Sequence, residues 1–429
     1  MKHVRSALLG LVLVGAGLPG TKAVLQGATQ GGTVQAPRFE VDPMWPKPMP
    51  NHWLLGSATG IAIDSRDHVY VLHLTDSFTA RTETGAGTIT PTGECCSSAP
   101  NVLEFDPSGN LVSSWGGPGQ GYDWPTQNAG IAIDPAGNIW IGGMGGTDTR
   151  VLKFTKDGKF VAQYGRQGQA PPPPPAAAAD TQYSGQSPAR GQGAAGRAGG
   201  RGGRGGRGGP PPLPAASTST EMFGGATAFA FDAGSSEVYV ADGARNRRIA
   251  VVDLNTGAIK RFFGAYGAAP DDAAASAPND PAPKQFAGVR CVETASDGNL
   301  YVCDSKNNRI QVLQKDGKLV REARIAPNTL ANGAVWDVAF SRDPQQRYVY
   351  VADGSNMKVH VLERSSLSHL TSFGEGGRYP GQFLAVSGVA TDSKGNLYTI
   401  EGAEGKKLQK FVFKGVGAVS RNQGVLWPK

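Results

Sequence analysis

Apolar and polar residues alternate along most of the chain, within a unit that recurs six times. Each copy begins with a short run in which apolar residues dominate every second position. A turn rich in Asp, Gly, Asn and Ser follows, and a second such run comes after it. A period of two residues is typical of β-strands, and the turn residues favour a hairpin. The six copies begin at Gly60, Gly130, Ala228, Cys291, Val338 and Gly388.

A third run follows the second in each copy, and a fourth follows in most copies after a turn such as Asp-Gly or Asn-Thr-Gly. A unit this short cannot bury its own apolar faces, so the copies must stack, and four-stranded units stack radially as propeller blades. The 61 glycines and 30 prolines, many of them between the runs, fit such a turn-rich fold. We therefore predict an all-β protein, a six-bladed β-propeller of four-stranded blades.

The sixth copy has a third run over residues 408–413 but no clear fourth run. Ahead of the first copy, the segment FEVDPMW, which starts at Phe39, reads as a strand without a partner. We expect this N-terminal strand to close the ring as the outer strand of the sixth blade.

The N-terminus has the features of a secretory signal peptide. Lys2 and Arg5 precede an apolar run over residues 7–18, which is too short to span a bilayer, and cleavage is expected after Ala23. The predicted organisation is a signal peptide over 1–23, a lead-in with the closing strand over 24–56, and the propeller over 57–429. We expect an exported protein, periplasmic or extracellular, with no membrane span after cleavage.

Residues 166–222 form a Pro-, Gly- and Arg-rich insert between the second and third blades, with PPPPP at 171–175 and RAGGRGGRGGRGGPPP from Arg197. This composition predicts disorder. The signal peptide and this insert hold most of the excess charge behind the net +7, and the rest of the chain is close to neutral. Although spaced arginines resemble RNA-binding segments, we do not expect nucleic acid as a partner.

Three long connections interrupt the repeats at equivalent places, at residues 74–101, 166–222 and 265–285. In a propeller, the loops between second and third strands lie on the same face as the loops between blades. We expect all three inserts on that face, and function-bearing loops concentrate on one end of such a scaffold. The expected partner is an unknown protein, a peptide or a small anionic ligand.

Four cysteines are too few for a disulfide scaffold. Counting from a two-residue Asp297-Gly298 turn places Cys291 opposite Asp304 and Cys303 opposite Val292, so we expect no bridge between these two thiols. Cys95 and Cys96 sit in a loop, where either a bond between neighbours or a pairing with another chain is open.

The second strand is followed in two copies by D-x-x-N-x-R-I or a close variant, from Asp242 and from Asp304. With this motif, the chain resembles the NHL repeat over about residues 57–414, without the inserts. The resemblance implies a six-bladed propeller. The opening segment from Phe39 also resembles exported bacterial NHL proteins similar to the peptidyl-amidoglycolate lyase domain.

That lyase type holds a zinc ion with three histidines, each one residue before a first strand. None of the six matching residues here is histidine; they are Thr59, Ala129, Thr227, Arg290, Trp336 and Ser387. The tyrosine that the resemblance implies near Asp242 is absent, and Leu74 stands where an arginine is implied. We therefore do not expect lyase activity by that zinc mechanism.

Arg290 and Trp336 occupy positions where the other copies have small residues, on adjacent blades at the mouth of the channel. A guanidinium and an aromatic ring suit an anionic or planar ligand. The alternative is that both simply fill the axial hole, with Arg290 paired to Glu293 or Asp337.

A second set of candidates ends the second strands of the blades. Carboxylates there could hold a hard cation such as calcium, as in a related class of propeller lactonases. Alternatively, the aspartates cap their own loops by accepting backbone N–H bonds. The candidate metal ligands are Asp242, Asp304 and Asp353, and we add His73 and Glu401 to the ligand-binding residues at the axial mouth. His68 reads as a turn residue and His52 as a packed one.

The sequence favours a non-catalytic binding or interaction scaffold that uses the insert-bearing face and the axial pocket. The alternative is a divergent lyase-like or lactonase-like enzyme with a carboxylate-held metal. No cofactor follows firmly, and calcium or another divalent metal is the candidate.

Overall fold

A computed structural model describes residues 32–78, 83–87, 91–166, 212–275, 277 and 280–428 of the chain. The predicted signal peptide and residues 167–211 of the insert lie outside this part, so the predictions for them stay predictions. Within it, no helix is long and apolar enough to cross a membrane. The described helical segments are the 3-10 turns η1 (Pro50–His52), η2 (Ala265–Gly267) and η3 (Ser305–Asn307).

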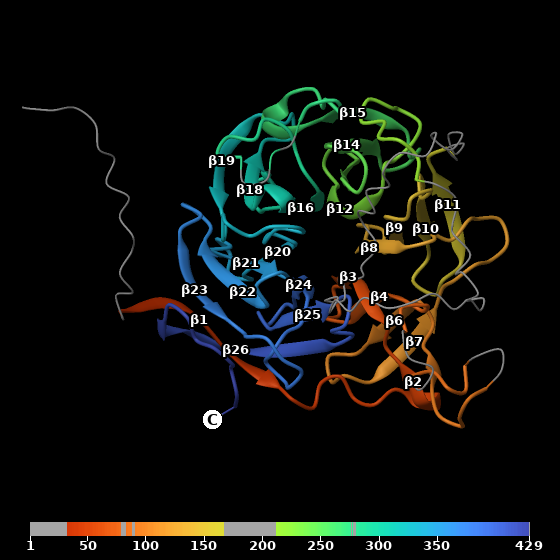
Figure 1. Ribbon diagram of the computed structural model, residues 1–429, viewed down its shortest axis with the longest axis vertical. Helices are drawn as coiled ribbons and strands as arrows, with labels where there is room; N and C mark the ends of the chain where they lie inside the picture. The colour runs from red at the N-terminus through yellow and green to blue at the C-terminus, as the bar shows by residue number, and fades with distance from the viewer. Residues whose placement is uncertain are drawn as a thin grey trace, which may run out of the picture. The chain divides into compact units, whose positions relative to one another are not determined.

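Six four-stranded antiparallel sheets surround a central axis (Figure 1), which confirms the predicted six-bladed propeller. Blades 1 to 3, from inner to outer strand, are β3 (Ser57–Ile63), β4 (Val69–Leu74), β6 (Val102–Phe105) and β7 (Leu111–Trp115); β8 (Asn128–Ile133), β9 (Ile139–Gly143), β10 (Val151–Phe154) and β11 (Phe160–Tyr164); and β12 (Ala226–Asp232), β13 (Glu237–Asp242), β14 (Arg248–Asp253) and β15 (Ile259–Phe263).

Blades 4 and 5 follow the same order. They are β16 (Val289–Thr294), β17 (Leu300–Asp304), β18 (Arg309–Leu313) and β19 (Leu319–Arg324); and β20 (Asp337–Phe340), β21 (Tyr348–Asp353), β22 (Lys358–Glu363) and β23 (His369–Phe373). A short parallel pair, β2 (Trp53–Leu54) with β5 (Ser97–Ser98), lies beside blade 1.

Blade 6 combines the two ends of the described chain. Its strands are β24 (Val386–Thr391), β25 (Leu397–Glu401), β26 (Leu408–Ser420) and, as the outer strand, the N-terminal β1 (Thr33–Asp42). In Figure 1, β1 in red runs beside β26 in blue. The chain therefore closes its ring through an N-terminal strand, as predicted.

The hydrophobic core lies between the blades, because each sheet carries buried side chains on both faces. One cluster joins blades 3 and 4 through residues such as Tyr239 and Val302, and another joins blades 4 and 5 through Tyr301 and Val349. Tight turns join first and second strands. In blade 2, the carboxylate of Asp134 accepts the backbone N–H of Asn138 at 2.8 Å. Such caps allow an almost identical turn in several blades.

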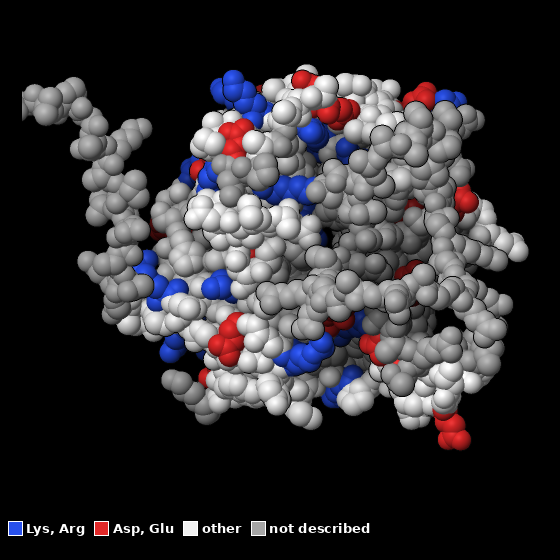
Figure 2. Space-filling model, in the orientation of Figure 1, with Lys and Arg blue, Asp and Glu red and all other residues white. Residues whose placement is uncertain are grey.

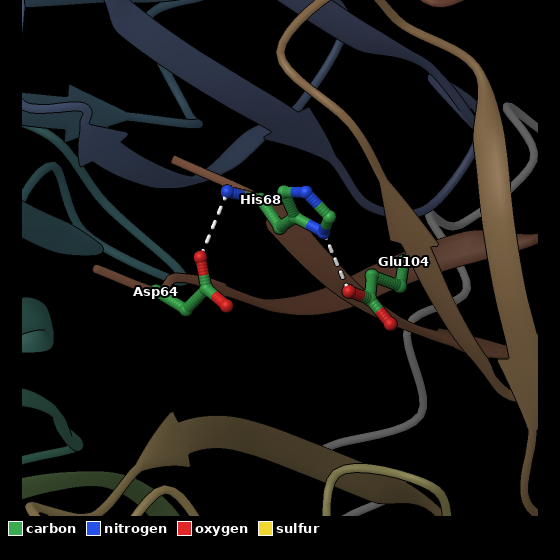
Figure 3. Close-up of side chains that lie close together, drawn as sticks. All are labelled: Asp64, His68 and Glu104. Atoms are coloured by element: carbon green, nitrogen blue, oxygen red, sulfur yellow. Dashed lines mark hydrogen bonds and ion pairs between the residues drawn. The ribbon is translucent and has the colours of Figure 1, made fainter. Parts of the chain in front are cut away.

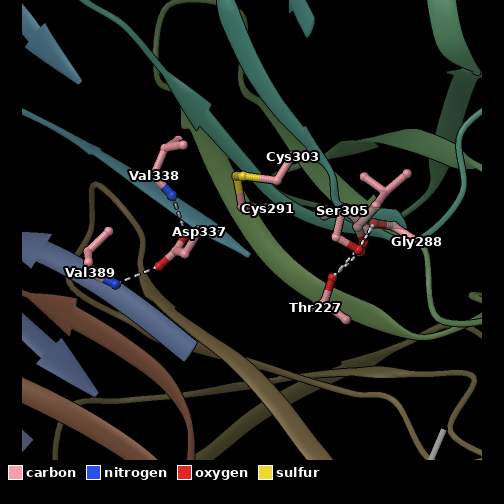
Figure 4. The surroundings of a disulfide bond; sticks show 10 residues. Thr227, Gly288, Cys291, Cys303, Ser305, Asp337, Val338 and Val389 are labelled. Carbon is pink, nitrogen blue, oxygen red and sulfur yellow. Dashed lines mark hydrogen bonds between the residues drawn. A yellow bond between two sulfur atoms is a disulfide. The ribbon is translucent and has the colours of Figure 1, made fainter. Parts of the chain in front are cut away.

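Both cysteine pairs form disulfides, Cys95 with Cys96 and Cys291 with Cys303. The expectation of no bridge in blade 4 is wrong. Its turn contains three residues, 296–298, because Ala295 donates its N–H to the Asn299 carbonyl and Gly298 adopts a φ of +79°. Compared with a two-residue turn, the register moves by one, and Cys291 lies directly opposite Cys303 (Figure 4).

The described parts of the inserts contact the propeller and one another. Residues 212–222, which end the predicted disordered insert, approach blade 3, where the buried guanidinium of Arg248 donates to the carbonyl of Ser217 at 2.8 Å. Ser217 in turn donates its N–H to Asp272, in the connection between blades 3 and 4, at 2.9 Å. Two of the three inserts thus meet beside blade 3.

Candidate functional site

A cavity of about 930 Å³ occupies the axis of the propeller and is lined by the inner strands of all six blades. The six positions that the repeat register singles out all line this cavity, although they lie far apart in the sequence. They are Thr59, Ala129, Thr227, Arg290, Trp336 and Ser387.

In five of the six blades, an irregularity of the inner strand lies at or next to this position. In blade 2 the irregularity comes one residue after Ala129, at Gly130, which adopts a φ of +64°. A bulged residue is left out of the ladder and its side chain is aimed in a new direction. In four other blades, the residue at this position has no partner on the second strand, although the residues before and after it are paired. These residues are Thr59, Thr227, Arg290 and Ser387.

Arg290 and Trp336 lie together at the end of the cavity. The guanidinium carbon of Arg290 lies 3.9 Å from the centroid of the Trp336 ring. The indole is held in place because its Nε1–H donates to the Gly333 carbonyl at 2.8 Å. It also lies over Gly354, where a Cβ would approach the ring to 2.4 Å. Within the described part of the chain, the Arg290 guanidinium makes no hydrogen bond or ion pair, so its donors face the cavity unsatisfied.

The charged side chains that line the cavity all come from blades 4 and 5. Besides Arg290, they are Glu293, Asp337 and Arg342. From the sequence, Glu293 and Asp337 were expected only as possible ion-pair partners of Arg290. Neither forms an ion pair with Arg290 among the described contacts. Arg342 was not singled out at all. Its guanidinium donates to the Thr391 carbonyl at 2.6 Å.

Asp337 is fixed between two blades by backbone donors. Its carboxylate accepts the N–H groups of Val338 and, from blade 6, of Val389, both at 2.9 Å (Figure 4). Burial nevertheless raises the pKa of Asp337 to about 7, against the lowering effect of these two donors and of the Arg290 guanidinium. The carboxyl therefore titrates near neutral pH.

Glu293 lies on the same strand as Arg290 and accepts no hydrogen bond from the described residues. Burial, followed by the negative charge of Asp337, raises the pKa of Glu293 to about 8, although Arg342 acts in the opposite direction. At pH 7 the glutamic acid is mostly neutral while both arginines are charged. The charged wall of the cavity is thus net positive and suited to an anion.

The residues that end the second strands do not line this cavity. Asp242 and Asp304 are fully buried, and each is paired with a fully buried arginine, Arg248 at 2.8 Å and Arg309 at 2.7 Å. Asp304 also accepts the N–H of Ala287 at 2.7 Å. The same arginines donate to loop carbonyls. These contacts explain the D-x-x-N-x-R-I pattern as a device that fixes the loops.

Asp353, Glu401 and His73 are also buried, and each is bonded to neighbouring loops or strands of the blades. The carboxylate of Asp353 accepts from Asn356 and lies 2.9 Å from His360 Nε2. Glu401 accepts the N–H of Leu384 at 2.8 Å. His73 Nδ1 accepts the N–H of Gly56, and its Nε2 faces the Pro100 carbonyl. Burial lowers the pKa of His73, which favours the neutral ring.

A histidine and two carboxylates meet at the turn of blade 1, where His68 Nδ1 lies 2.6 Å from Glu104 (Figure 3). His68 occupies the turn position of Asn138, because its N–H donates to Asp64 at 2.9 Å. Lys156 reaches Asp64 at 2.9 Å, and Arg66 contacts both carboxylates. Two cations already neutralise this cluster, which argues against a further metal ion.

On the face drawn in Figure 2, basic and acidic side chains of the described residues are interspersed over the surface. This distribution differs from the single-sign stripe expected of a nucleic-acid-binding face.

Comparison with known proteins supports the repeat assignment. The family model of the NHL repeat matches residues 286–313, in blade 4. No curated protein sequence matches the chain. A structural genomics protein of unknown function from Bacteroides thetaiotaomicron has 14% identity and a TM-score of 0.50, over 89% of this chain and 77% of that one. At this identity the similarity concerns the fold.

Two further solved structures align with lower TM-scores. A catalytically inactive virginiamycin B lyase from Staphylococcus aureus, with quinupristin, has 12% identity and a TM-score of 0.44, over 88% of this chain and 99% of that one. The Cps50 (Swd1) β-propeller domain of Myceliophteria thermophila has 12% identity and a TM-score of 0.45, over 83% of this chain and 96% of that one.

Proposed function

We propose that this protein, a six-bladed β-propeller with an NHL repeat in its fourth blade, is a binding protein that holds a small organic anion in its axial cavity. Arg290 recognises the negative charge, and the insert-bearing face forms the entrance. The observation that carries the proposal is the guanidinium of Arg290, held on the Trp336 ring and directed into the cavity without a partner among the described residues.

The volume of the axial cavity favours a binding site over a plug, in which Arg290 and Trp336 would only fill the axial hole. If Arg290 and Trp336 only filled the axial hole, little space would remain between the inner strands, yet the cavity measures about 930 Å³. Cavities of roughly 300–1,000 Å³ with apolar walls and a few polar groups are typical of small-molecule sites. An arginine stacked on an aromatic ring is also pre-organised to bind a planar carboxylate, because less side-chain freedom is lost on binding.

The contacts of the second-strand carboxylates favour this reading over a metal-dependent enzyme. Asp242 and Asp304 already accept hydrogen bonds from backbone, asparagine and arginine groups, so a metal ion would have to displace those donors. A buried carboxylate that loses an arginine partner leaves an uncompensated charge, which is costly.

A panel of aromatic and aliphatic carboxylates and their neutral amides tests the proposal by thermal unfolding. The best carboxylate is expected to raise the Tm of the wild type, while its amide is not, because only the anion pairs with Arg290. Arg290→Ala should lose this response. Arg66→Gln removes the same charge from a side chain that is 60% exposed at a turn outside the cavity, and it should keep the response.

The free energy of unfolding of Arg290→Ala is expected to stay within about 1 kcal/mol of the wild type, since the guanidinium contacts the Trp336 ring and makes no hydrogen bond or ion pair among the described residues. A variant that is strongly destabilised would support the plug instead. A variant that still responds to the carboxylates would contradict the role of Arg290.

A further inference from the structure

The two sides of the axial cavity differ in character. All four charged lining residues come from blades 4 and 5. The inner strands of blades 1, 2 and 3 contribute no charged lining residue among the described ones, and they offer partly exposed apolar residues such as Ile61, Ile133 and Phe231. A ligand that fills the cavity therefore meets a polar wall on one side and an apolar wall on the other.

We infer that the ligand is an amphipathic organic acid, with its anionic group at Arg290 and its apolar body against blades 1 to 3, and that its binding is linked to the proton on Glu293. This inference rests on the proposed function, because it concerns the same cavity. It names the chemical class of the ligand and the condition under which it binds.

The position of Arg290 orients the ligand along the axis. Trp336 lies over Gly354, in the loop that follows the second strand of blade 5, so the Arg290–Trp336 pair belongs to the insert-bearing end. Glu293 lies three residues further along β16, about 10 Å deeper at the usual rise of a strand. The anionic group thus stays near the entrance, and the neutral carboxyl of Glu293 lies beside the buried part of the ligand.

The charged groups around Glu293 explain the proton linkage. Asp337 from β20 raises its pKa, Arg342 from the turn after that strand lowers it, and Arg290 precedes it on β16. As the pH rises through about 7 and then about 8, Asp337 and Glu293 ionise in turn. Two new negative charges then offset the two arginines, so the affinity for an anion falls as the pH increases.

A matched pair of fluorescent probes separates the charge from the apolar body. 8-Anilino-1-naphthalenesulfonate and N-phenyl-1-naphthylamine share the same rings, and only the first carries a permanent negative charge. Neither probe titrates between pH 5.5 and 9, so any pH dependence belongs to the protein. Affinities are measured by fluorescence titration over this range for the wild type, Arg290→Gln, Glu293→Gln and Arg66→Gln.

The wild type is expected to bind the sulfonate roughly ten-fold more tightly than the neutral probe at pH 6, which is the effect of one charge-assisted contact. This preference should shrink above pH 7. Arg290→Gln should remove the preference at pH 6. Glu293→Gln should abolish the part of the fall above about pH 7.5 and leave the part that Asp337 causes. Arg66→Gln should behave as the wild type does.

Different failures have different meanings. A preference for the sulfonate that does not change with pH or with Glu293→Gln would overturn the inference and leave the anion site of the proposed function in place. Equal affinity for the two probes at pH 6 would overturn the proposed function and the inference with it, because the cavity would then not recognise a negative charge. If neither probe binds at any pH, the proposed function falls, and the inference falls with it.

Discussion

At the residue scale, the site depends on one equivalent position in each copy of the repeat. Six side chains at equivalent places line the axis, and the sequence register found all six because their spacing from the turn is fixed. Irregularities in the inner strands of five blades, which the pattern does not reveal, redirect the side chains at or next to these positions, whereas Trp336 of blade 5 comes just before its strand. The position in the repeat predicted which residues meet at the axis. The direction of their side chains depends on the local backbone.

The acidic residues of the cavity were only partly foreseen. Glu293 and Asp337 entered the sequence argument as ion-pair partners that would neutralise Arg290. Instead, Asp337 binds two backbone N–H groups, one of them from blade 6, and Glu293 stays without a hydrogen bond among the described residues. A raised pKa arises from burial and from neighbours on other blades, and sequence spacing does not encode these distances.

Asp304 offers a test of the loop-cap role against the metal role. Asp304→Ala removes the buried carboxylate that pairs with Arg309 and leaves only the partly exposed Glu322, at 3.2 Å, as its acidic partner; we expect a loss of about 3 kcal/mol in the free energy of unfolding, measured with urea. Asp316→Ala, at an exposed turn of the same blade, should cost less than about 1 kcal/mol.

Metal content measured on the same samples gives the contrary outcome. If the wild type holds a stoichiometric divalent metal that Asp304→Ala loses, the carboxylate is a ligand rather than a cap.

At the scale of elements, alternation and turn chemistry predicted the strands and the closing strand. The turn of blade 4 was read one residue too short, which moved the register and hid the Cys291–Cys303 bridge. Either turn length suits an Asp-Gly sequence, and the choice depends on whether Gly298 takes a left-handed conformation. A one-residue error in a hairpin is enough to reverse a conclusion about which side chains meet.

The closing strand β1 should carry much of the stability of blade 6. Phe39 is 4% exposed and its ring contacts those of Tyr350, Phe373 and Phe413. Phe39→Ala is therefore expected to lower the free energy of unfolding by about 3–5 kcal/mol in urea denaturation.

The adjacent Glu40 provides the control, because among the described residues its side chain contacts Lys414 alone, in an ion pair at 2.9 Å, and is 28% exposed. Glu40→Ala should change stability by less than about 1 kcal/mol. Equal effects of the two substitutions would mean that β1 does not hold the ring closed.

At the scale of the whole molecule, the sequence predicted the number of blades, the closure of the ring and an axial cavity lined by the inner strands. It did not predict that the charged lining residues gather on two blades, because each blade taken alone looks like a variant of the same unit. This asymmetry appears only when the six inner strands are brought around one axis. Because of this asymmetry, the cavity has a charged side and an apolar side, although the six blades are built from the same repeat.

The most direct test of the account is a crystal structure of the protein soaked with 4-iodobenzoate, because the anomalous signal of iodine locates the ligand independently of the rest of the density. We predict an iodine peak inside the axial cavity, on the side of blades 1 to 3, with the carboxylate within hydrogen-bond distance of Arg290. Iodine peaks only outside the cavity, or a bound benzoate that leaves Arg290 without a contact, would contradict the account.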